Sequence, residues 1–134
     1  MVVDVDGVLS DASGRQHLLA GETRAWDRFF EATVTDPPIP EGIRLVEHLV
    51  GGRTTILLTA RPARLVDTTT AWLDHHSVGW DMLVMRADGD HRSSPDVKAT
   101  ALAGLRADGH QVELAVDDDP RNAEMYWGEG VPVV

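Results

Sequence analysis

The chain has 134 residues, a hydrophobic content of 43% and a formal net charge of −10 at pH 7. This length predicts one domain, residues 1–134, and is too short for two. Such an acidic balance excludes general electrostatic binding of nucleic acid, because phosphate contacts need Lys and Arg. The chain has no cysteine, which excludes disulfides and thiol nucleophiles; because no apolar run reaches membrane-spanning length and no signal peptide precedes the first predicted strand, we expect a cytoplasmic protein without a membrane span.

Short apolar runs alternate along the chain with longer amphipathic segments. In chain order, the pattern predicts a strand at 1–5, a helix at 41–50, a strand at 54–60, a helix at 62–76, a strand at 81–86, a helix at 95–107, a strand at 112–117, a helix at 120–127 and a strand at 131–134. This alternation predicts an α/β fold with a five-stranded parallel sheet and helices on both faces. In such sheets, ligands bind beyond the carboxyl ends of the strands.

Three of the predicted strands end in polar side chains, most of which are acids. The groups are Asp4 and Asp6 after the first strand, Thr59 and Arg61 after the second, and Asp117, Asp118 and Asp119 after the fourth. Taken alone, the first pair is equally typical of a loop whose acids are solvated or cap the backbone. Several carboxylates at one sheet edge repel each other without a cation, and oxygen ligands of this kind suit Mg²⁺.

Lys98 is the only lysine among twelve basic residues. It lies in the first turn of a predicted helix, where the helix dipole disfavours a cation by roughly 0.3–1 kcal/mol. An unfavourable position for the only lysine favours a functional role. The tryptophans, in contrast, are expected to pack in the core or in a subdomain rather than to stack on bases; they are Trp26, Trp72, Trp80 and Trp127.

Four segments resemble the four motifs of the haloacid dehalogenase (HAD) superfamily: "DVDGVLSD", "LLTARP", the lysine of "SPDVK" and "AVDDDP". In addition, "MLVMRADGDHRSSPDVK" and "VELAVDDDPRNAEMYWGEGVPVV" are similar to the phosphatase domain of polynucleotide kinase–phosphatases. The similarity covers nearly the whole chain and is weakest at residues 20–42. It implies a Rossmann-like HAD fold with strand order 5-4-1-2-3.

The resemblance implies a role for each motif. Asp4 is expected to be the nucleophile that forms an aspartyl-phosphate, and Asp6 the general acid and then the general base. Thr59, with the N–H of Ala60, is expected to bind a phosphoryl oxygen, and Lys98 to stabilise the charge of the transferring group.

The same resemblance implies a Mg²⁺ site formed by Asp4, the main-chain carbonyl of Asp6, and Asp118, with Asp117 in support. It also implies that arginines bind the substrate's phosphates; the candidates are Arg15, Arg61, Arg86 and Arg92.

The gaps between the motifs are too short for a separate cap domain, so we expect a capless, open site. An open site suits a bulky phosphomonoester such as a nucleic-acid 3′ end or a nucleotide. The alternatives are a small-metabolite HAD phosphatase, for a sugar acid or a nucleotide, and a non-catalytic phosphate-binding module. Because the chain begins and ends in predicted strands, we also expect an excised or naturally minimal domain. The resemblance to polynucleotide kinase–phosphatases implies a fused or associated kinase domain as a possible partner.

Overall fold

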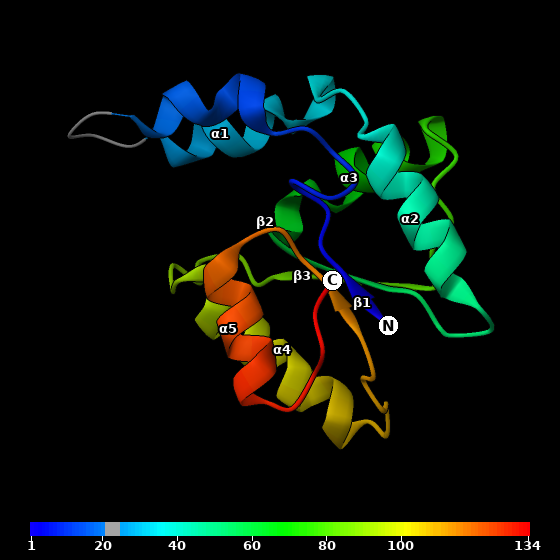
Figure 1. Ribbon diagram of the computed structural model, residues 1–134. Helices are drawn as coiled ribbons and strands as arrows, with labels where there is room; N and C mark the ends of the chain where they lie inside the picture. The colour runs from blue at the N-terminus through cyan, green and yellow to red at the C-terminus, as the bar shows by residue number, and fades with distance from the viewer. Residues whose placement is uncertain (21–24) are drawn as a thin grey trace.

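The computed structural model in Figure 1 describes residues 1–20 and 25–134. Its sheet is parallel and has the order β3-β2-β1-β4. The strands are β1 (Val2–Val3), β2 (Ile56–Pro62), β3 (Met82–Arg86) and β4 (Ala115–Val116). The α/β fold with a parallel sheet that was predicted from the sequence is therefore present, and the four strands follow the predicted order.

The predicted fifth strand is not formed in the described part of the chain, which corrects the strand count from five to four. Residues 131–134 do run beside β4, and the N–H of Val134 donates to the carbonyl of Ala115 at 2.9 Å. Their contact with β4 is a single bridge between Ala115 and Val133. Pro132 has no N–H to donate, so it shortens the hydrogen-bond ladder at this edge.

The predicted helices are confirmed with small changes at their ends: α2 (Pro40–Val50), α3 (Val66–His75) after the short helix η3 (Ala63–Leu65), α4 (Ser94–Ala107) and α5 (Pro120–Gly128). Local sequence explains where two of them begin. The side chains of Ser93 and Asp119 accept hydrogen bonds from the first turns of α4 and α5, and a proline follows within each first turn. Among the described residues, no helix is both long enough and apolar enough to cross a bilayer.

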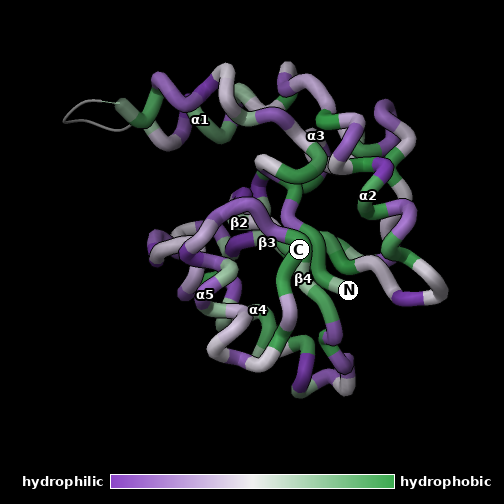
Figure 2. Tube along the Cα trace, in the orientation of Figure 1, coloured by the Kyte–Doolittle hydropathy of each residue, from purple (hydrophilic) through white to green (hydrophobic). Residues whose placement is uncertain are grey.

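Helices α2 and α3 cover one face of the sheet, and α4 and α5 cover the other (Figure 1). Successive residues of each strand point to opposite faces, so Val3 and Leu57 pack toward α2 and α3, whereas Val2 and Leu58 pack toward α4 and α5. Figure 2 shows the resulting apolar centre, with polar residues gathered in the surrounding loops. Burying each of these side chains contributes about 1.5–3 kcal/mol to the stability of the fold.

A helical segment between β1 and α2 lies beyond the carboxyl end of β1 (Figure 1). It consists of η1 (Ser13–Leu19), α1 (Trp26–Glu31) and η2 (Ala32–Thr35). The longest of these three helices, η1, has seven residues. In its described part, the segment is therefore an arm of short helices rather than a cap domain, which agrees with the short spacing between the motifs.

Candidate active site

The turn after β1 places the first two acids at the edge of the sheet. The N–H of Asp4 donates to the carbonyl of Val116 at 2.8 Å, and the N–H groups of Leu9 and Ser10 both donate to the carbonyl of Val5 at 2.9 Å. Gly7 has a φ of +86°, and a Cβ at this position would collide with the carboxylate of Asp118. Glycine therefore allows the turn and also the close approach of the acidic loop that follows β4.

Lys98 connects the ends of β1 and β4. Its Nζ lies 3.0 Å from Oδ1 of Asp4 and 2.6 Å from Oδ2 of Asp117, and its side chain is only 1% exposed. Nδ2 of Asn122 donates to both oxygens of Asp117, at 3.1 Å each. The only lysine of the chain is thus a buried cation between two carboxylates, and its functional role stays a prediction.

These charges shift one another's ionisation. Burial is the largest influence on Asp4 and raises its pKa to about 7, although Lys98 lowers it; the carboxylates of Asp117 and Asp6 add to the rise. Burial alone would lower the pKa of Lys98, but Asp4 and Asp117 outweigh this effect and raise it. A further cation beside Asp4 would therefore favour its ionised form.

Three carboxylates have the arrangement needed for such a cation. Asp4, Asp117 and Asp118 each bring a ligand oxygen within 4.8 Å of the others. Burial, followed by the charge of Asp117, raises the pKa of Asp118 as well. An all-oxygen donor set of few carboxylates fits Mg²⁺. Because both oxygens of Asp117 already accept hydrogen bonds from Lys98 or Asn122, Asp4 and Asp118 are the better direct ligands.

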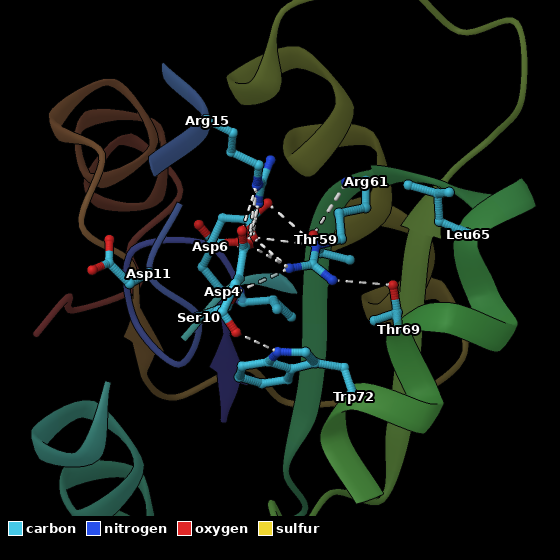
Figure 3. Close-up of polar contacts among 12 residues, drawn as sticks. Asp4, Asp6, Ser10, Asp11, Arg15, Thr59, Arg61, Leu65, Thr69 and Trp72 are labelled. Atoms are coloured by element: carbon cyan, nitrogen blue, oxygen red, sulfur yellow. Dashed lines mark hydrogen bonds and ion pairs between the residues drawn. The ribbon is translucent and has the colours of Figure 1, made fainter. Parts of the chain in front are cut away.

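The carboxylate of Asp6 is held between two arginines (Figure 3). Nη2 of Arg15 lies 2.8 Å from Oδ1 of Asp6, and Nη2 of Arg61 lies 2.7 Å from the same oxygen. The Asp6 side chain is 23% exposed, whereas the side chains of Arg15 and Arg61 are 3% and 0% exposed. Asp6 is therefore accessible to a ligand, while the two cations that orient it are not free to move away.

A second buried acid completes this network. The carboxylate of Asp36 accepts hydrogen bonds from Nη2 of Arg15 at 2.7 Å and from Oγ of Ser10 at 2.9 Å, and Nη1 of Arg61 donates to Oγ1 of Thr69 at 3.2 Å. Sequence reasoning missed Asp36, Ser10 and Thr69. Asp36 precedes two prolines, which is typical of a turn, and only its tertiary contact with Arg15 distinguishes it from a solvated acid.

Thr59 and Ala60 lie within β2, which continues past the predicted end at residue 60 to Pro62, and the pairing with β3 shifts register between Thr59 and Pro62. Thr59 is buried, and its Oγ1 accepts a hydrogen bond from the N–H of Arg61 at 3.2 Å. The carbonyl of Ala60 accepts a hydrogen bond from Nε of Arg86 at 2.8 Å. The end of β2 is thus fixed by contacts of its own and by an arginine from β3.

The structure does not bring Arg86 and Arg92 into the same cluster as Arg15 and Arg61. Nη1 of Arg86 donates to the carbonyls of Asp90 and Arg92, at 2.9 and 2.6 Å, so this side chain supports the loop after β3. Nη2 of Arg92 lies 2.8 Å from Oδ2 of Asp90. The side-chain and backbone hydrogen bonds from Arg92 lower the pKa of Asp90 to about 2. The contacts with substrate that were predicted for Arg86 and Arg92 stay predictions.

The tryptophans divide into two groups. Trp72 is buried, and its Nε1 donates to the carbonyl of Asp36 at 2.8 Å; Trp80 is partly buried against the core. Trp26 packs on neighbouring aromatic rings but is 44% exposed, and Trp127 on α5 is 64% exposed. The expectation of buried packing is therefore confirmed for Trp72 and Trp80 and is wrong for Trp127, while Trp26 packs on Phe29 and Phe30 and is partly exposed.

Comparison with known proteins agrees with this geometry. A family model described as "Polynucleotide kinase PNKP phosphatase domain" matches residues 1–134. A search of curated proteins finds no match.

Solved structures with a similar fold include chains from the Pnkp1/Rnl/Hen1 RNA repair complex (TM-score 0.78, 22% identity) and from a second structure of the Pnkp1/Rnl/Hen1 complex (TM-score 0.74, 23% identity). Each matches 99% of this chain, which spans 40% and 44% of their lengths. A haloacid dehalogenase-like family hydrolase from Streptococcus pneumoniae matches 98% of this chain over 81% of its own length, with a TM-score of 0.65 and 14% identity.

Proposed function

This chain belongs to the family of polynucleotide kinase PNKP phosphatase domains and is a phosphatase of the HAD class; on that premise, we propose that it removes a phosphate from nucleic-acid 3′ ends or from nucleotides. The observation that carries this proposal is the pairing of two differently held acids at one sheet edge. Asp4 is held by the ammonium of Lys98, and Asp6 is held by two buried guanidiniums.

We propose that Asp4 is the nucleophile. Its carboxylate oxygen forms a bond to phosphorus, and the ester P–O bond breaks with its electron pair on the leaving oxygen. That oxygen takes a proton from Asp6, which enters this step as the carboxylic acid and leaves it as the carboxylate that Arg15 and Arg61 hold. A water molecule then gives a proton to Asp6 and attacks the aspartyl-phosphate, which releases inorganic phosphate and restores the carboxylate of Asp4.

The neighbouring side chains provide orientation and charge. Arg15 and Arg61 both donate through Nη2 to Oδ1 of Asp6, and Nε of Arg61 also lies 3.3 Å from Oδ2, so the two arginines fix the orientation of the whole carboxyl group. Lys98 offsets negative charge that develops next to Asp4, and the buried position of the lysine strengthens this effect. We propose that the hydroxyl of Thr59 and the N–H of Ala60 bind phosphoryl oxygens at the end of β2.

A magnesium ion fits the carboxylate cluster of Asp4, Asp117 and Asp118. We propose that Asp4 and Asp118 hold it together with the carbonyl of Asp6, and that Asp117 supports the site through Lys98. When bound, Mg²⁺ supplies positive charge against the phosphoryl oxygens. It also lets Asp4 and Asp118 remain ionised side by side, although burial raises the pKa of both.

The 3′ position of the phosphate is inferred from the family, and the short helices of the arm, which form no cap domain in its described part, support it. Chains of similar fold occur in the Pnkp1/Rnl/Hen1 RNA repair complex and are more than twice as long as this one. We therefore propose that this domain acts together with further domains or partners, such as a fused or associated kinase.

A substrate panel tests the proposal. Nucleoside 3′-monophosphates, short oligonucleotides with a 3′-phosphate, sugar phosphates and 4-nitrophenyl phosphate are assayed for phosphate release with Mg²⁺. We expect the 3′-nucleotides and 3′-phosphorylated oligonucleotides to have the highest kcat/KM. Faster hydrolysis of sugar phosphates would favour a metabolite phosphatase instead, and no release from any ester would favour a phosphate-binding module.

A further inference from the structure

Asp36 is a buried acid that takes no part in the chemistry proposed above. It lies between η2 and α2, and its side chain is 5% exposed. Its carboxylate faces the guanidinium of Arg15 with two parallel hydrogen bonds, from Nε to Oδ1 at 2.9 Å and from Nη2 to Oδ2 at 2.7 Å. A paired fork of this kind fixes the plane of both groups, so Asp36 determines how the guanidinium of Arg15 is oriented.

Arg15 joins Asp36 to the proposed general acid. The Nη2 that lies 2.7 Å from Oδ2 of Asp36 also lies 2.8 Å from Oδ1 of Asp6. The Arg15 side chain is 3% exposed, so solvent does not replace either acid as its partner. The orientation that Asp36 gives to the guanidinium therefore determines the direction from which Nη2 meets the carboxyl group of Asp6.

A second path leads from Asp36 to Arg61. Oγ of Ser10 donates to Oδ2 of Asp36 at 2.9 Å and accepts a hydrogen bond from Nη2 of Arg61 at 3.3 Å. The same Nη2 lies 3.6 Å from Oδ2 of Asp36 and 2.7 Å from Oδ1 of Asp6. Asp36 is thus connected to both arginines that hold Asp6 (Figure 3 shows Asp6 and the two arginines), and the two acids balance the two cations.

We propose that Asp36 is a positioning residue for the phosphatase reaction: it fixes Arg15 and Arg61, and these two side chains aim the carboxyl group of Asp6 at the leaving oxygen. This inference rests on the proposed function, in which Asp6 is the general acid. Asp36 suits the role because it is itself anchored, since its carbonyl accepts a hydrogen bond from Nε1 of Trp72 at 2.8 Å.

The test compares two leaving groups. Benzyl phosphate releases an alkoxide that needs a proton from Asp6, whereas 4-nitrophenyl phosphate releases a stable phenolate that does not. The kcat/KM of each ester in Mg²⁺ covers the steps up to the departure of the leaving group and leaves out the later hydrolysis of the aspartyl-phosphate.

We expect Asp36→Asn to lower the ratio of kcat/KM for benzyl phosphate to that for 4-nitrophenyl phosphate roughly 10- to 100-fold. This is part of the roughly 10²- to 10⁴-fold that a general acid contributes. A purely structural role would lower both values alike and leave the ratio unchanged, which would overturn the proposal.

Asp81→Asn is the matched control. Asp81 also accepts a hydrogen bond, from the N–H of Thr55 at 2.7 Å, but it lies before β3, at the edge of the sheet opposite the proposed site. We expect this variant to keep the wild-type ratio, and a fall equal to that of Asp36→Asn would overturn the proposal.

Arg15→Lys serves where Asp36→Asn does not fold, because it keeps the charge of the buried cluster. An ammonium lacks the planar fork with which Arg15 bonds both acids, so we expect the ratio to fall in this variant as well. An unchanged ratio in folded Arg15→Lys would overturn the proposal, because Asp36 would then not act through this arginine.

A double variant tests whether Asp36 acts through Asp6. In an Asp6→Asn background, Asp36→Asn should lower the ratio no further, since residues that act as one unit are not additive. A further fall as large as that in the wild-type background would overturn the proposal.

Two outcomes separate this inference from the function on which it rests. If Asp6→Asn lowers kcat/KM for both esters alike, Asp6 is not the general acid and the role of Asp36 fails with it. If Asp36→Asn lowers the ratio as expected while the wild type hydrolyses no nucleoside 3′-monophosphate, the proposed substrate fails and the role of Asp36 stands.

Discussion

Nη2 of Arg61 lies 2.7 Å from Oδ1 of Asp6, and the arginine side chain has no solvent exposure although Asp6 does. The pair joins the turn after β1 to the end of β2, 55 residues apart in the chain. A buried cation whose partner is partly exposed is fixed in place, so the proposed general acid can be oriented without being sealed from substrate. Removing the arginine would leave Asp6 and the buried Asp36 with less compensating charge.

We therefore expect Arg61→Ala to lower the free energy of unfolding by about 3–5 kcal/mol, as is usual when one partner of a buried ion pair is removed. Urea denaturation measures this change. Arg64→Ala is the control, because the Arg64 side chain is 40% exposed, and we expect it to change stability by about 0–1 kcal/mol. Equal effects of the two variants would show that the buried network adds little to stability.

The pKa of Asp4 predicts a pH dependence for the metal-free protein. An aspartate whose pKa rises from 3.8 in the unfolded chain to about 7 in the folded chain binds its proton more tightly when folded. Its contribution to stability is therefore fully present below pH 4 and is lost as the pH rises through about 7. We expect the melting temperature in EDTA to fall between pH 5 and pH 8, and this fall to be smaller in Asp4→Asn.

The same physical reason predicts that Asp4→Asn melts at a higher temperature than the wild type in EDTA at pH 8, because it removes a carboxylate that burial disfavours. Asp11→Asn is the control, since the Asp11 side chain accepts a hydrogen bond from the N–H of Ser13 in the same loop and points away from the site (Figure 3). A lower melting temperature for Asp4→Asn under these conditions would show that the attraction of Lys98 outweighs the burial of Asp4.

Magnesium should stabilise the folded chain, because an ion that binds only the folded state shifts the folding equilibrium toward that state. We expect the melting temperature to rise with millimolar Mg²⁺ at pH 8. The rise should be much smaller in Asp118→Asn, which keeps the shape of the side chain but removes its charge. Thermal unfolding monitored by circular dichroism measures both. Identical curves with EDTA and with Mg²⁺ would contradict the proposed metal site.

The acidic composition predicts a weak dependence of oligonucleotide hydrolysis on salt. Binding through one or two phosphates beyond the scissile group gives a slope of log KM against log salt of about 0.7 to 1.4, since each neutralised phosphate of a single strand contributes about 0.7. KM for 3′-phosphorylated oligonucleotides of increasing length, measured between low and high salt, tests this. A slope that grows steadily with length would indicate an extended nucleic-acid surface instead.

Local signals made much of the fold predictable. The prolines that begin α4 and α5 follow capping side chains, and the central strands are continuously apolar because both of their faces are buried. The segment 131–134 has the same apolar character, but Pro132 interrupts its ladder, so composition alone overestimated the sheet. Strand propensity is a property of a single segment, whereas the hydrogen-bond ladder of a sheet depends on which backbone groups of the neighbouring strand lie opposite.

The site was predictable where acids follow a strand, as with Asp4 and Asp118, and where Lys98, the only lysine, lies in the first turn of a helix. The structure brings these residues to one edge of the sheet, and their roles stay predictions. The residues that hold these side chains and the neighbouring loops in place were not predictable. Asp36 carries no local signal, because its partner Arg15 lies 21 residues away and is reached only after the arm folds. The same holds for Arg86, whose bonds to three carbonyls depend on the path of the loop after β3.

The most direct test of the proposed chemistry is phosphate release from a nucleoside 3′-monophosphate in Mg²⁺ by the wild type and by Asp4→Asn. The two side chains have nearly the same size, so the variant removes the attacking charge while the fold is kept, as a melting curve verifies. We predict release by the wild type and less than a few per cent of it by Asp4→Asn, on the order of the residual left when a covalent nucleophile is lost. Substantial release by the folded Asp4→Asn variant would contradict Asp4 as the nucleophile.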